Sequence, residues 1–147
     1  MEKLDSLSYT AGIIEGEGCI QITKERNKQY QKDYYRVRVY VDNSNPLMPI
    51  FLHEKYGGYL GSWEQKNKKW RRVFRWRAEI KDTKSFLLKM KDYVTCKRDE
   101  VDTALSFFDA KNVTEKEALY QRMKFLKSPE YCASIYQKIM EKGGEKE

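Results

Sequence analysis

Hydrophobic and polar residues alternate along two stretches in the first third of the chain, which is the pattern of a β-strand with one buried face. In residues 19–24, Ile20 and Ile22 share one side of such a strand. Residues 34–42 alternate more clearly: one side carries Tyr35, Val37, Val39 and Val41, and the other carries Arg36, Arg38 and Tyr40. The polar segment between the two stretches predicts a hairpin loop.

A second pair of strands is predicted over residues 59–66 and 70–80, with a turn near Asn67. The later strand has an apolar side and a mostly charged side. The apolar side would carry Phe74, Trp76, Ala78 and Ile80, and the other side Arg71, Val73, Arg75, Arg77 and Glu79.

The remaining segments have the periodicity and the end signals of helices. A first helix is predicted over residues 4–17, with Ser6 or Ser8 as its cap and Gly18 at its end. Further helices are predicted over residues 47–56, over 82–93 with Asp82 as the cap, and over 98–110, 114–126 and 129–142. The sequence Thr114-Glu115-Lys116-Glu117 has the form of a capping box.

This order of elements predicts an α+β fold, αββαββα, with a four-stranded antiparallel sheet, helices on one of its faces and extra C-terminal helices. We expect residues 1–111 to form the core domain and residues 112–147 to form a C-terminal helical extension.

The charge of the chain points to an anionic partner. Lys and Arg number 29 against 22 Asp and Glu, which gives a net charge of +7. The excess is concentrated, because residues 66–77 hold seven basic residues and no acid. The uncovered face of the sheet would carry Gln21, Thr23, Arg36, Arg38, Tyr40, Arg71, Arg75 and Arg77. Since arginine and glutamine read base edges and also hold phosphates, we interpret this face as a nucleic-acid surface rather than an ordinary solvated one.

Other classes of protein are disfavoured. No run of 18 apolar residues is present, so no membrane span is expected, and the first residues lack the pattern of a signal peptide. Three widely spaced cysteines and one histidine, His53, give no zinc-site spacing and no disulfide framework. We expect an intracellular protein, without a prediction of the compartment, in which His53 has a structural role.

The first predicted helix contains unusual residues. Gly12 and Gly16 lie four positions apart, on one face, although glycine inside a helix costs about 1 kcal/mol relative to alanine. The close approach of a second helix would explain both. Glu15 and Glu17 lie in the last turn, where the helix dipole disfavours anions. Glu15 alone could simply be exposed, but Glu17, beside Gly18 and the basic sheet, predicts a nearby cation.

The segment Thr10–Gly18, TAGIIEGEG, resembles the LAGLIDADG motif of the homing endonucleases of that name, with both glycines and both acids in register. The predicted order of elements agrees with that family over about residues 4–110. The resemblance implies an intron-encoded, metal-dependent nuclease that cuts both strands of a long pseudo-palindromic DNA site. Because the chain has a single motif, it also implies a homodimer with Gly12 and Gly16 at its interface.

The resemblance assigns roles to individual residues. Glu17, with the carbonyl of Gly16, would bind Mg²⁺; Mn²⁺ is an alternative, and Ca²⁺ is expected to bind without supporting cleavage. Lys97 would stabilise charge on the phosphate, Asn43 would orient the attacking water, and Glu15 would have a structural role. The implied DNA contacts are Gln21, Thr23, Glu25, Arg36, Arg38, Tyr40, Trp63, Gln65, Lys66, Lys68, Arg71, Arg75 and Arg77.

Two alternatives stay open. The first is a nucleic-acid binder on the same fold that does not cleave, such as an RNA maturase or a transcription factor; the presence of Glu17 together with Lys97 favours cleavage. The second is an RNA-binding module in which exposed aromatic residues stack on unpaired bases. Its candidates are Trp63, Trp70, Trp76 and Tyr40, of which we assign Trp76 to the core.

Overall fold

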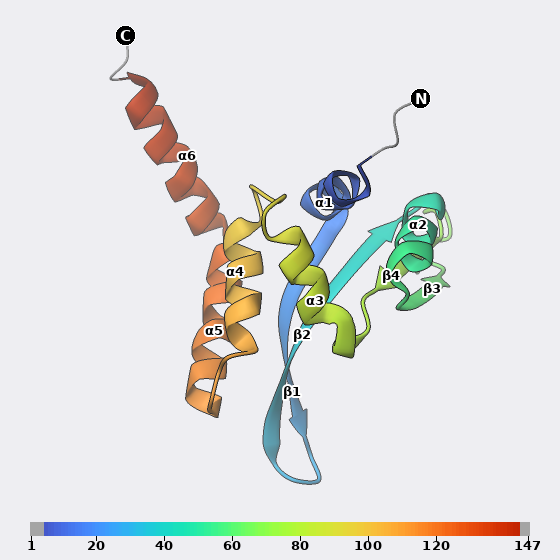
Figure 1. The fold of residues 1–147 in the computed structure, drawn as a ribbon, viewed down its shortest axis with the longest axis horizontal. Helices are drawn as coiled ribbons and strands as arrows, with labels where there is room; N and C mark the ends of the chain where they lie inside the picture. Colours follow the sequence, from blue (N-terminus) through green and yellow to red (C-terminus); the bar gives the residue numbers. More distant parts are fainter. Residues whose placement is uncertain (1–4, 145–147) are drawn as a thin grey trace.

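The structure, a computed structural model, describes residues 5–144, which form six helices and four strands (Figure 1). The elements are, in order, α1 (Ser6–Glu17), β1 (Gly18–Asn27), β2 (Lys32–Asn43), α2 (Leu47–Tyr56), β3 (Tyr59–Trp63), β4 (Val73–Arg77), α3 (Ile80–Met90), α4 (Arg98–Phe107), α5 (Val113–Leu126) and α6 (Pro129–Gly144).

The strands form one antiparallel sheet in the order β1-β2-β4-β3. Ile20 pairs with Val39, and Tyr40 pairs with Arg77. The first hairpin is long and extends past the rest of the sheet (Figure 1). This topology confirms the α+β architecture that the sequence predicts.

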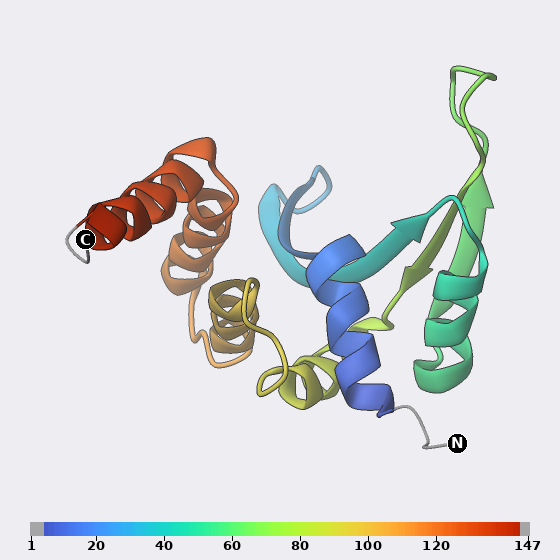
Figure 2. The same cartoon turned by 90° about the horizontal axis from the view of Figure 1, so that it is seen from above.

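The helices cover one face of the sheet, as Figure 2 shows for α1 and α3. Val37, Val39 and Val41, which the alternation places on one side of β2, are all buried against this layer. Trp76 of β4 is fully buried, and its indole N–H donates to the carbonyl of Gly57 at 2.7 Å. The assignment of Trp76 to the core is therefore confirmed, and the stacking role considered for it is wrong.

The second pair of strands is shorter than predicted. β3 ends at Trp63 and β4 begins at Val73, so residues 64–72 form a loop that carries Gln65, Lys66, Lys68 and Arg71. Nearly every side chain in this segment is polar or charged, and a strand extension would have no apolar face to bury. Ile80 begins α3 and is 61% exposed, so it does not share the apolar face of β4 as predicted.

Three predicted helix caps are wrong. Asp5, rather than Ser6 or Ser8, caps α1 and accepts from the amides of Leu7 and Ser8. The hydroxyl of Ser8 also donates to this carboxylate, at 2.7 Å, and this bond, followed by those from the amides, lowers the pKa of Asp5. The predicted start of this helix at residue 4 falls outside the described residues.

Asp82 lies inside the first turn of α3, so it does not cap that helix. The capping box of α5 starts two residues before Thr114: Asn112 accepts from the amide of Glu115 at 2.9 Å, and Glu115 accepts from the amide of Lys111 at 2.6 Å.

The last two helices differ in how they pack. α5 lies against α4 and β1, where Glu117 pairs with Lys24 at 3.1 Å and accepts from the hydroxyl of Tyr35 at 2.5 Å. α6 projects away from the rest of the molecule (Figure 1). Within the described part of the chain, no helix is both long and apolar enough to cross a lipid bilayer.

Candidate active site and nucleic-acid interface

The site begins where α1 ends, because this helix passes into β1 without a connecting loop. Gly18 has an extended backbone, with φ −84° and ψ 159°, and its amide still donates to the carbonyl of Ile14. A Cβ atom on Gly18 would lie 2.8 Å from the Cα and carbonyl oxygen of Ile14. Only glycine therefore allows this abrupt junction, which leaves Glu17 exposed at the junction of the helix and the sheet.

The face of α1 that carries the motif glycines is open in the single chain. Gly12 and Gly16 are exposed, and a Cβ atom on either would meet nothing within 4 Å. Packing within residues 5–144 therefore does not explain why these positions are glycine, whereas it does explain Gly18.

Lys97 lies at the same end of α1 as Glu17. Its ammonium group donates to the carbonyl of Ile14 at 2.8 Å and to the carbonyl of Gly18 at 2.5 Å. The C-terminal end of a helix carries the negative end of the helix dipole, so a cation is stabilised there.

Glu15 holds the segment that precedes Lys97. Its carboxylate accepts from the amide of Cys96 at 2.9 Å and from the amide of Thr95. The carboxylate of Glu15 is therefore a structural ligand of a loop that is 80 residues away in the sequence. Within residues 5–144, by contrast, the Glu17 carboxylate has no hydrogen bond or ion pair.

The two acids thus have different surroundings, and only Glu17 is free to bind a cation. A carboxylate and the backbone carbonyls of a helix end are hard oxygen donors, which Mg²⁺ prefers. No group of three His, Cys, Asp or Glu side chains that could hold a metal ion exists among the described residues. Among these residues, the Glu17 carboxylate and the neighbouring backbone carbonyls are the oxygen donors at the end of α1.

Asn43 is at the end of β2, on the same side of the strand as Val41. Its carbonyl oxygen accepts from the amide of Asn45 at 2.8 Å, and its amide nitrogen lies 3.7 Å from the sulfur of Met48. These contacts belong to the turn into α2 and do not join Asn43 to Glu17 or Lys97, so its role in orienting water stays a prediction.

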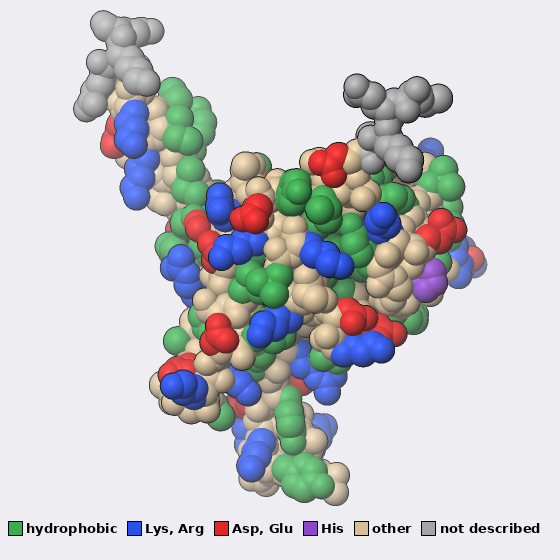
Figure 3. Space-filling view, viewed as in Figure 1, with side chains coloured by type: hydrophobic (Ala, Val, Ile, Leu, Met, Phe, Trp, Pro, Cys, Tyr) green, Lys and Arg blue, Asp and Glu red, His purple; other side chains and the backbone are tan. Residues whose placement is uncertain are grey.

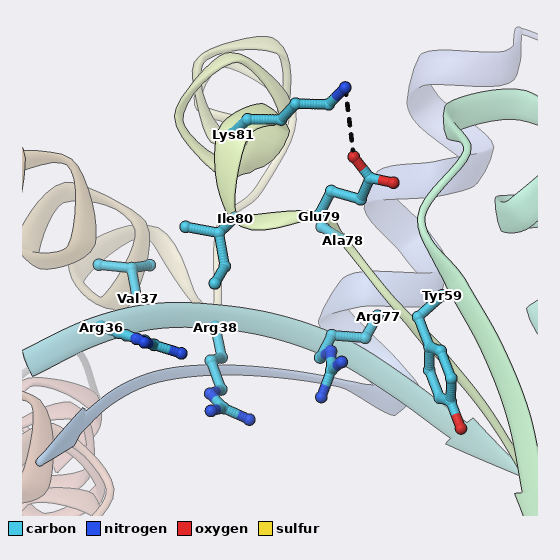
Figure 4. Close-up of a pocket in the computed structure, with 9 residues that line it drawn as sticks. All are labelled: Arg36, Val37, Arg38, Tyr59, Arg77, Ala78, Glu79, Ile80 and Lys81. Atoms are coloured by element: carbon cyan, nitrogen blue, oxygen red, sulfur yellow. Dashed lines mark ion pairs between the residues drawn. The ribbon is translucent and has the colours of Figure 1, made fainter. Parts of the chain in front are cut away.

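The uncovered face of the sheet gathers polar side chains from all four strands. The register aligns Gln21 with Arg38, Thr23 with Arg36, and Tyr40 with Arg77. Figure 4 shows Arg36, Arg38 and Arg77 extending from this face, away from α3. They border a hollow of about 380 Å³, whose other lining residues include Tyr59.

Aromatic rings and acids hold several of these cations in position. The guanidinium group of Arg77 lies 5.0 Å from the centre of the Tyr59 ring, and Arg38 pairs with Glu25 at 3.3 Å. Arg36 and Arg38 lie on β2, in the part of the strand before Val39, which is not paired with β4. These two arginines therefore lie beside the hollow without a neighbouring strand on that side.

Arg75 is the most tightly held cation on the face. It donates two hydrogen bonds to Asp42, at 2.6 and 2.7 Å, and its guanidinium group lies 4.1 Å from the centre of the Tyr40 ring and 4.9 Å from that of Trp63. The bond to Asp42 raises the pKa of Arg75. Burial, followed by the neighbouring Cys19, raises the pKa of Tyr40 to about 12, so its hydroxyl stays protonated at neutral pH.

No protein-family model matches the sequence, and no curated protein matches it. Solved structures do match the fold. The homing endonuclease I-CvuI, in complex with the I-CreI target, gives a TM-score of 0.66 at 16% identity over 83% of this chain and 82% of its own. The archaeal intron-encoded homing endonuclease I-Vdi141I, complexed with DNA, gives 0.64 at 14% identity over 84% of each chain.

A third match extends the comparison to a longer protein. The LAGLIDADG homing endonuclease I-GzeII, in complex with its DNA target, gives a TM-score of 0.54 at 12% identity over 84% of this chain and 44% of its own. This chain has the LAGLIDADG homing-endonuclease fold. The architecture implied by the resemblance of the motif is therefore present, and the motif itself forms the last turns of α1.

Within this LAGLIDADG fold, the predicted site residues other than Asn43 and the two motif glycines fall into three groups. Glu17 and Lys97 lie together at the end of α1, next to the sheet. The strand residues Gln21, Thr23, Glu25, Arg36, Arg38, Tyr40, Trp63, Arg75 and Arg77 lie on the uncovered face. The residues Gln65, Lys66, Lys68 and Arg71 lie in the loop between β3 and β4, where Gln65 donates to the carbonyl of Arg71 at 2.9 Å. That the strand and loop residues of the last two groups contact DNA stays a prediction.

Sequence reasoning missed Asp42 and Tyr59, which orient Arg75 and Arg77 on this face. Asp42 follows Tyr40 on the polar side of β2, so the alternation could have placed it on the face. Its pairing with Arg75 depends on the register between β2 and β4, which no local pattern reveals.

Proposed function

We propose that this protein is a site-specific DNA endonuclease that acts as a homodimer and cuts both strands of a long, pseudo-palindromic site with the help of a divalent cation. The observation that carries the proposal is the position of Glu17 and Lys97 at one end of α1, where the helix enters the arginine-bearing sheet. An unpaired acid and a cation next to a nucleic-acid surface are the groups that hydrolysis of a phosphodiester needs.

Recognition of DNA would use the uncovered face. A two-stranded ribbon fits the major groove, and arginine side chains read guanine or hold phosphates. Arg36 and Arg38 on β2 and Arg77 on β4 would supply these contacts. The fixed Arg75 would give a more selective contact, because its orientation is set by Asp42 before DNA binds.

The homodimer would form through α1. The open side of this helix carries Gly12 and Gly16, whose lack of side chains lets a second helix approach closely. A two-fold axis beside these glycines brings the two Glu17 carboxylates near each other. Two such charges repel unless a cation lies between them, so dimer formation and cation binding would support each other.

In the cleavage step, the Glu17 carboxylate and the Gly16 carbonyl would hold Mg²⁺, or Mn²⁺ in its place. When bound, such a cation lowers the pKa of a bound water and stabilises a leaving oxygen. Lys97 would supply positive charge to the phosphate, from a position fixed by its two carbonyl partners. Asn43 would orient water from the end of β2. Ca²⁺ would occupy the site without supporting turnover.

The test compares the wild type with Glu17→Gln on a library of randomised duplex DNA in the presence of Mg²⁺. Wild-type protein should yield cut duplexes that share one sequence. In the variant, the amide loses the charge that holds the cation, so the cleavage rate should fall by roughly 100-fold or more while binding of the selected site persists. Asp109→Asn makes the same change at an exposed position in the turn after α4 and should cleave normally.

The outcomes separate the alternatives. Cleavage that survives Glu17→Gln contradicts the assignment of the cation ligand. Wild-type protein that selects one duplex but cuts it with neither Mg²⁺ nor Mn²⁺ is instead a non-cleaving binder on the same fold.

A further inference from the structure

The helix α6 carries an apolar stripe that is exposed in the single chain. Ile135, Tyr136, Ile139 and Met140 recur at the spacing of one helix face and keep 40 to 66% of their surface accessible. Figure 3 shows hydrophobic side chains gathered on the side of α6 that faces α1, and basic ones on its outer side. A stripe of this kind is normally covered by another element.

Only the first turn of α6 is attached to its own chain. The ring of Tyr131 lies 5.3 Å from that of Phe125, and its hydroxyl donates to Asp99 at 2.9 Å, a bond that also raises the pKa of Tyr131. The rest of the helix rises clear of the molecule (Figure 1). An isolated helix as short as the outer part of α6, residues 133–144, is marginal in water, so these turns need a partner to be stable.

The proposed dimer supplies a partner in the right place. In Figure 1, α1 is seen almost end-on, with α6 on one side of it and α2 on the other. A two-fold axis parallel to α1, next to Gly12 and Gly16, exchanges these two sides. The α6 helix of one copy therefore comes alongside the α2 helix of the other copy.

The helix α2 and the neighbouring part of α1 carry exposed apolar side chains, which an apolar stripe could cover. Leu47, at the start of α2, is 70% exposed. Tyr9 of α1, which is 40% exposed, contacts the ring of Phe51 edge-on with the ring centres 5.0 Å apart. Tyr9 is one turn before Gly12, so this apolar surface is continuous with the helix interface.

The area that a stable dimer must bury gives a second, independent reason to expect α6 at the interface. A stable complex usually buries about 1,200–2,000 Å². Two copies of the 12-residue α1, which meet through glycines, offer little area. Two α6 stripes would provide the missing apolar surface.

We infer that α6 is a dimerisation arm, which packs Ile135, Tyr136, Ile139 and Met140 on the α2 helix of a second copy of this chain. The inference rests on the proposed homodimer and adds the surface that holds it together. The α6 helix of each copy crosses the interface and packs on the other copy, so the dimer has one such contact on each of two opposite sides.

The first test is the dimer dissociation constant from sedimentation equilibrium of the full-length protein. Ile139→Asp puts a charge into the stripe and should raise the constant by about tenfold or more. Gln137→Asp puts the same charge on the opposite side of α6 and should leave it within about twofold. Circular dichroism of both variants checks that the helices still form.

The second test replaces Tyr136 with a photo-reactive phenylalanine analogue. Equal amounts of ¹⁵N-labelled and unlabelled chains are mixed before irradiation, so that cross-links between chains carry both isotopes. Mixed-isotope links to residues 47–56 are expected. Links within one chain only, or an unchanged dissociation constant in Ile139→Asp, contradict the arm.

The results also separate this inference from the nuclease. If DNA is cut but Ile139→Asp dimerises normally, the arm is wrong and the nuclease stands. If no DNA is cut but Ile139→Asp weakens the dimer, the nuclease is wrong and the arm stands. A wild type that is monomeric at every concentration, with and without DNA, contradicts both.

Discussion

Glu15 and Glu17 are two positions apart in α1, yet their side chains meet different surroundings. Two helical positions differ by about 200° around the axis, so the carboxylates point in opposite directions. Glu15 accepts from two backbone amides of residues 95 and 96, which fixes the segment before Lys97. Glu17 is left exposed at the end of the helix. The first acid positions the lysine, and the second is available for a ligand.

Gly18 gives a stability prediction at the same junction. Gly18→Ala brings a Cβ atom to 2.8 Å from the backbone of Ile14, which cannot rotate away. The junction must shift, and we expect the free energy of unfolding in urea to fall by about 1–3 kcal/mol.

Gly12→Ala is the matched control, since its Cβ atom would meet nothing within 4 Å. It should raise the stability of the single chain by up to about 1 kcal/mol, through helix propensity, while weakening the dimer. Equal loss of stability in both variants would show that strain at Gly18 is not the cause.

Single residues were predictable where one position carries its own signal. The burial of Trp76 followed from the alternation in β4, and the end of α1 followed from the glycine at position 18. The contacts of Glu15 with residues 95 and 96, and of Arg75 with Asp42, join distant parts of the chain. Composition and periodicity carry no information about them.

At the scale of elements, Glu117 attaches α5 to the sheet through Lys24 of β1 and Tyr35 of β2. The hydroxyl of Tyr35 lowers the pKa of Glu117, with further contributions from Gln121 and Lys24. In return, Glu117 raises the pKa of Lys24. Burial raises the pKa of Tyr35, so this residue remains a donor at neutral pH.

These contacts predict a dependence on pH. Because the folded-state pKa of Glu117 is lowered from its ordinary value of 4.5, its contribution to stability is present above that pH and is lost as the pH falls through the lowered value. Glu117→Gln should therefore speed hydrogen exchange of the α5 amides at pH 7.

The difference in hydrogen-exchange rate between the wild type and Glu117→Gln should shrink at pH values below the folded-state pKa of Glu117. At such pH values the wild-type carboxyl is also neutral. Glu141→Gln, on the exposed part of α6, should match the wild type at every pH. A difference between Glu117→Gln and the wild type that does not change with pH would contradict this role of the charge.

The elements themselves were predictable to different degrees. β1, β2 and α2 were predicted within a few residues, because strict alternation and the Gly57-Gly58 pair mark them locally. β3 and β4 were predicted too long, because residues 64–72 are nearly all polar or charged and offer no apolar face that would hold them in the sheet. The helix caps were misplaced by one to three residues, since several Ser, Asp, Thr and Asn side chains compete near each helix start.

At the scale of the whole molecule, each copy in the proposed dimer would cleave one strand of the DNA. If each copy of Glu17 serves the cleavage of one strand, a mixed dimer of wild type and Glu17→Gln should nick its target. With co-expressed, differently tagged chains, supercoiled plasmid carrying the target should accumulate as open circle. Wild-type dimers should give linear plasmid, and dimers with two variant chains should leave it supercoiled. Linear product from the mixed dimer would contradict the division of work.

The passage from α1 into β1 without a loop has a consequence for the length of DNA that such a protein could read. With no hinge between the two elements, the angle at which the paired helices cross would also set the tilt between the two sheets. That tilt would fix the distance separating the two half-sites. Small changes of side-chain volume at Gly12 or Gly16 would then alter the spacing of the recognised sequence without touching a single base-reading residue.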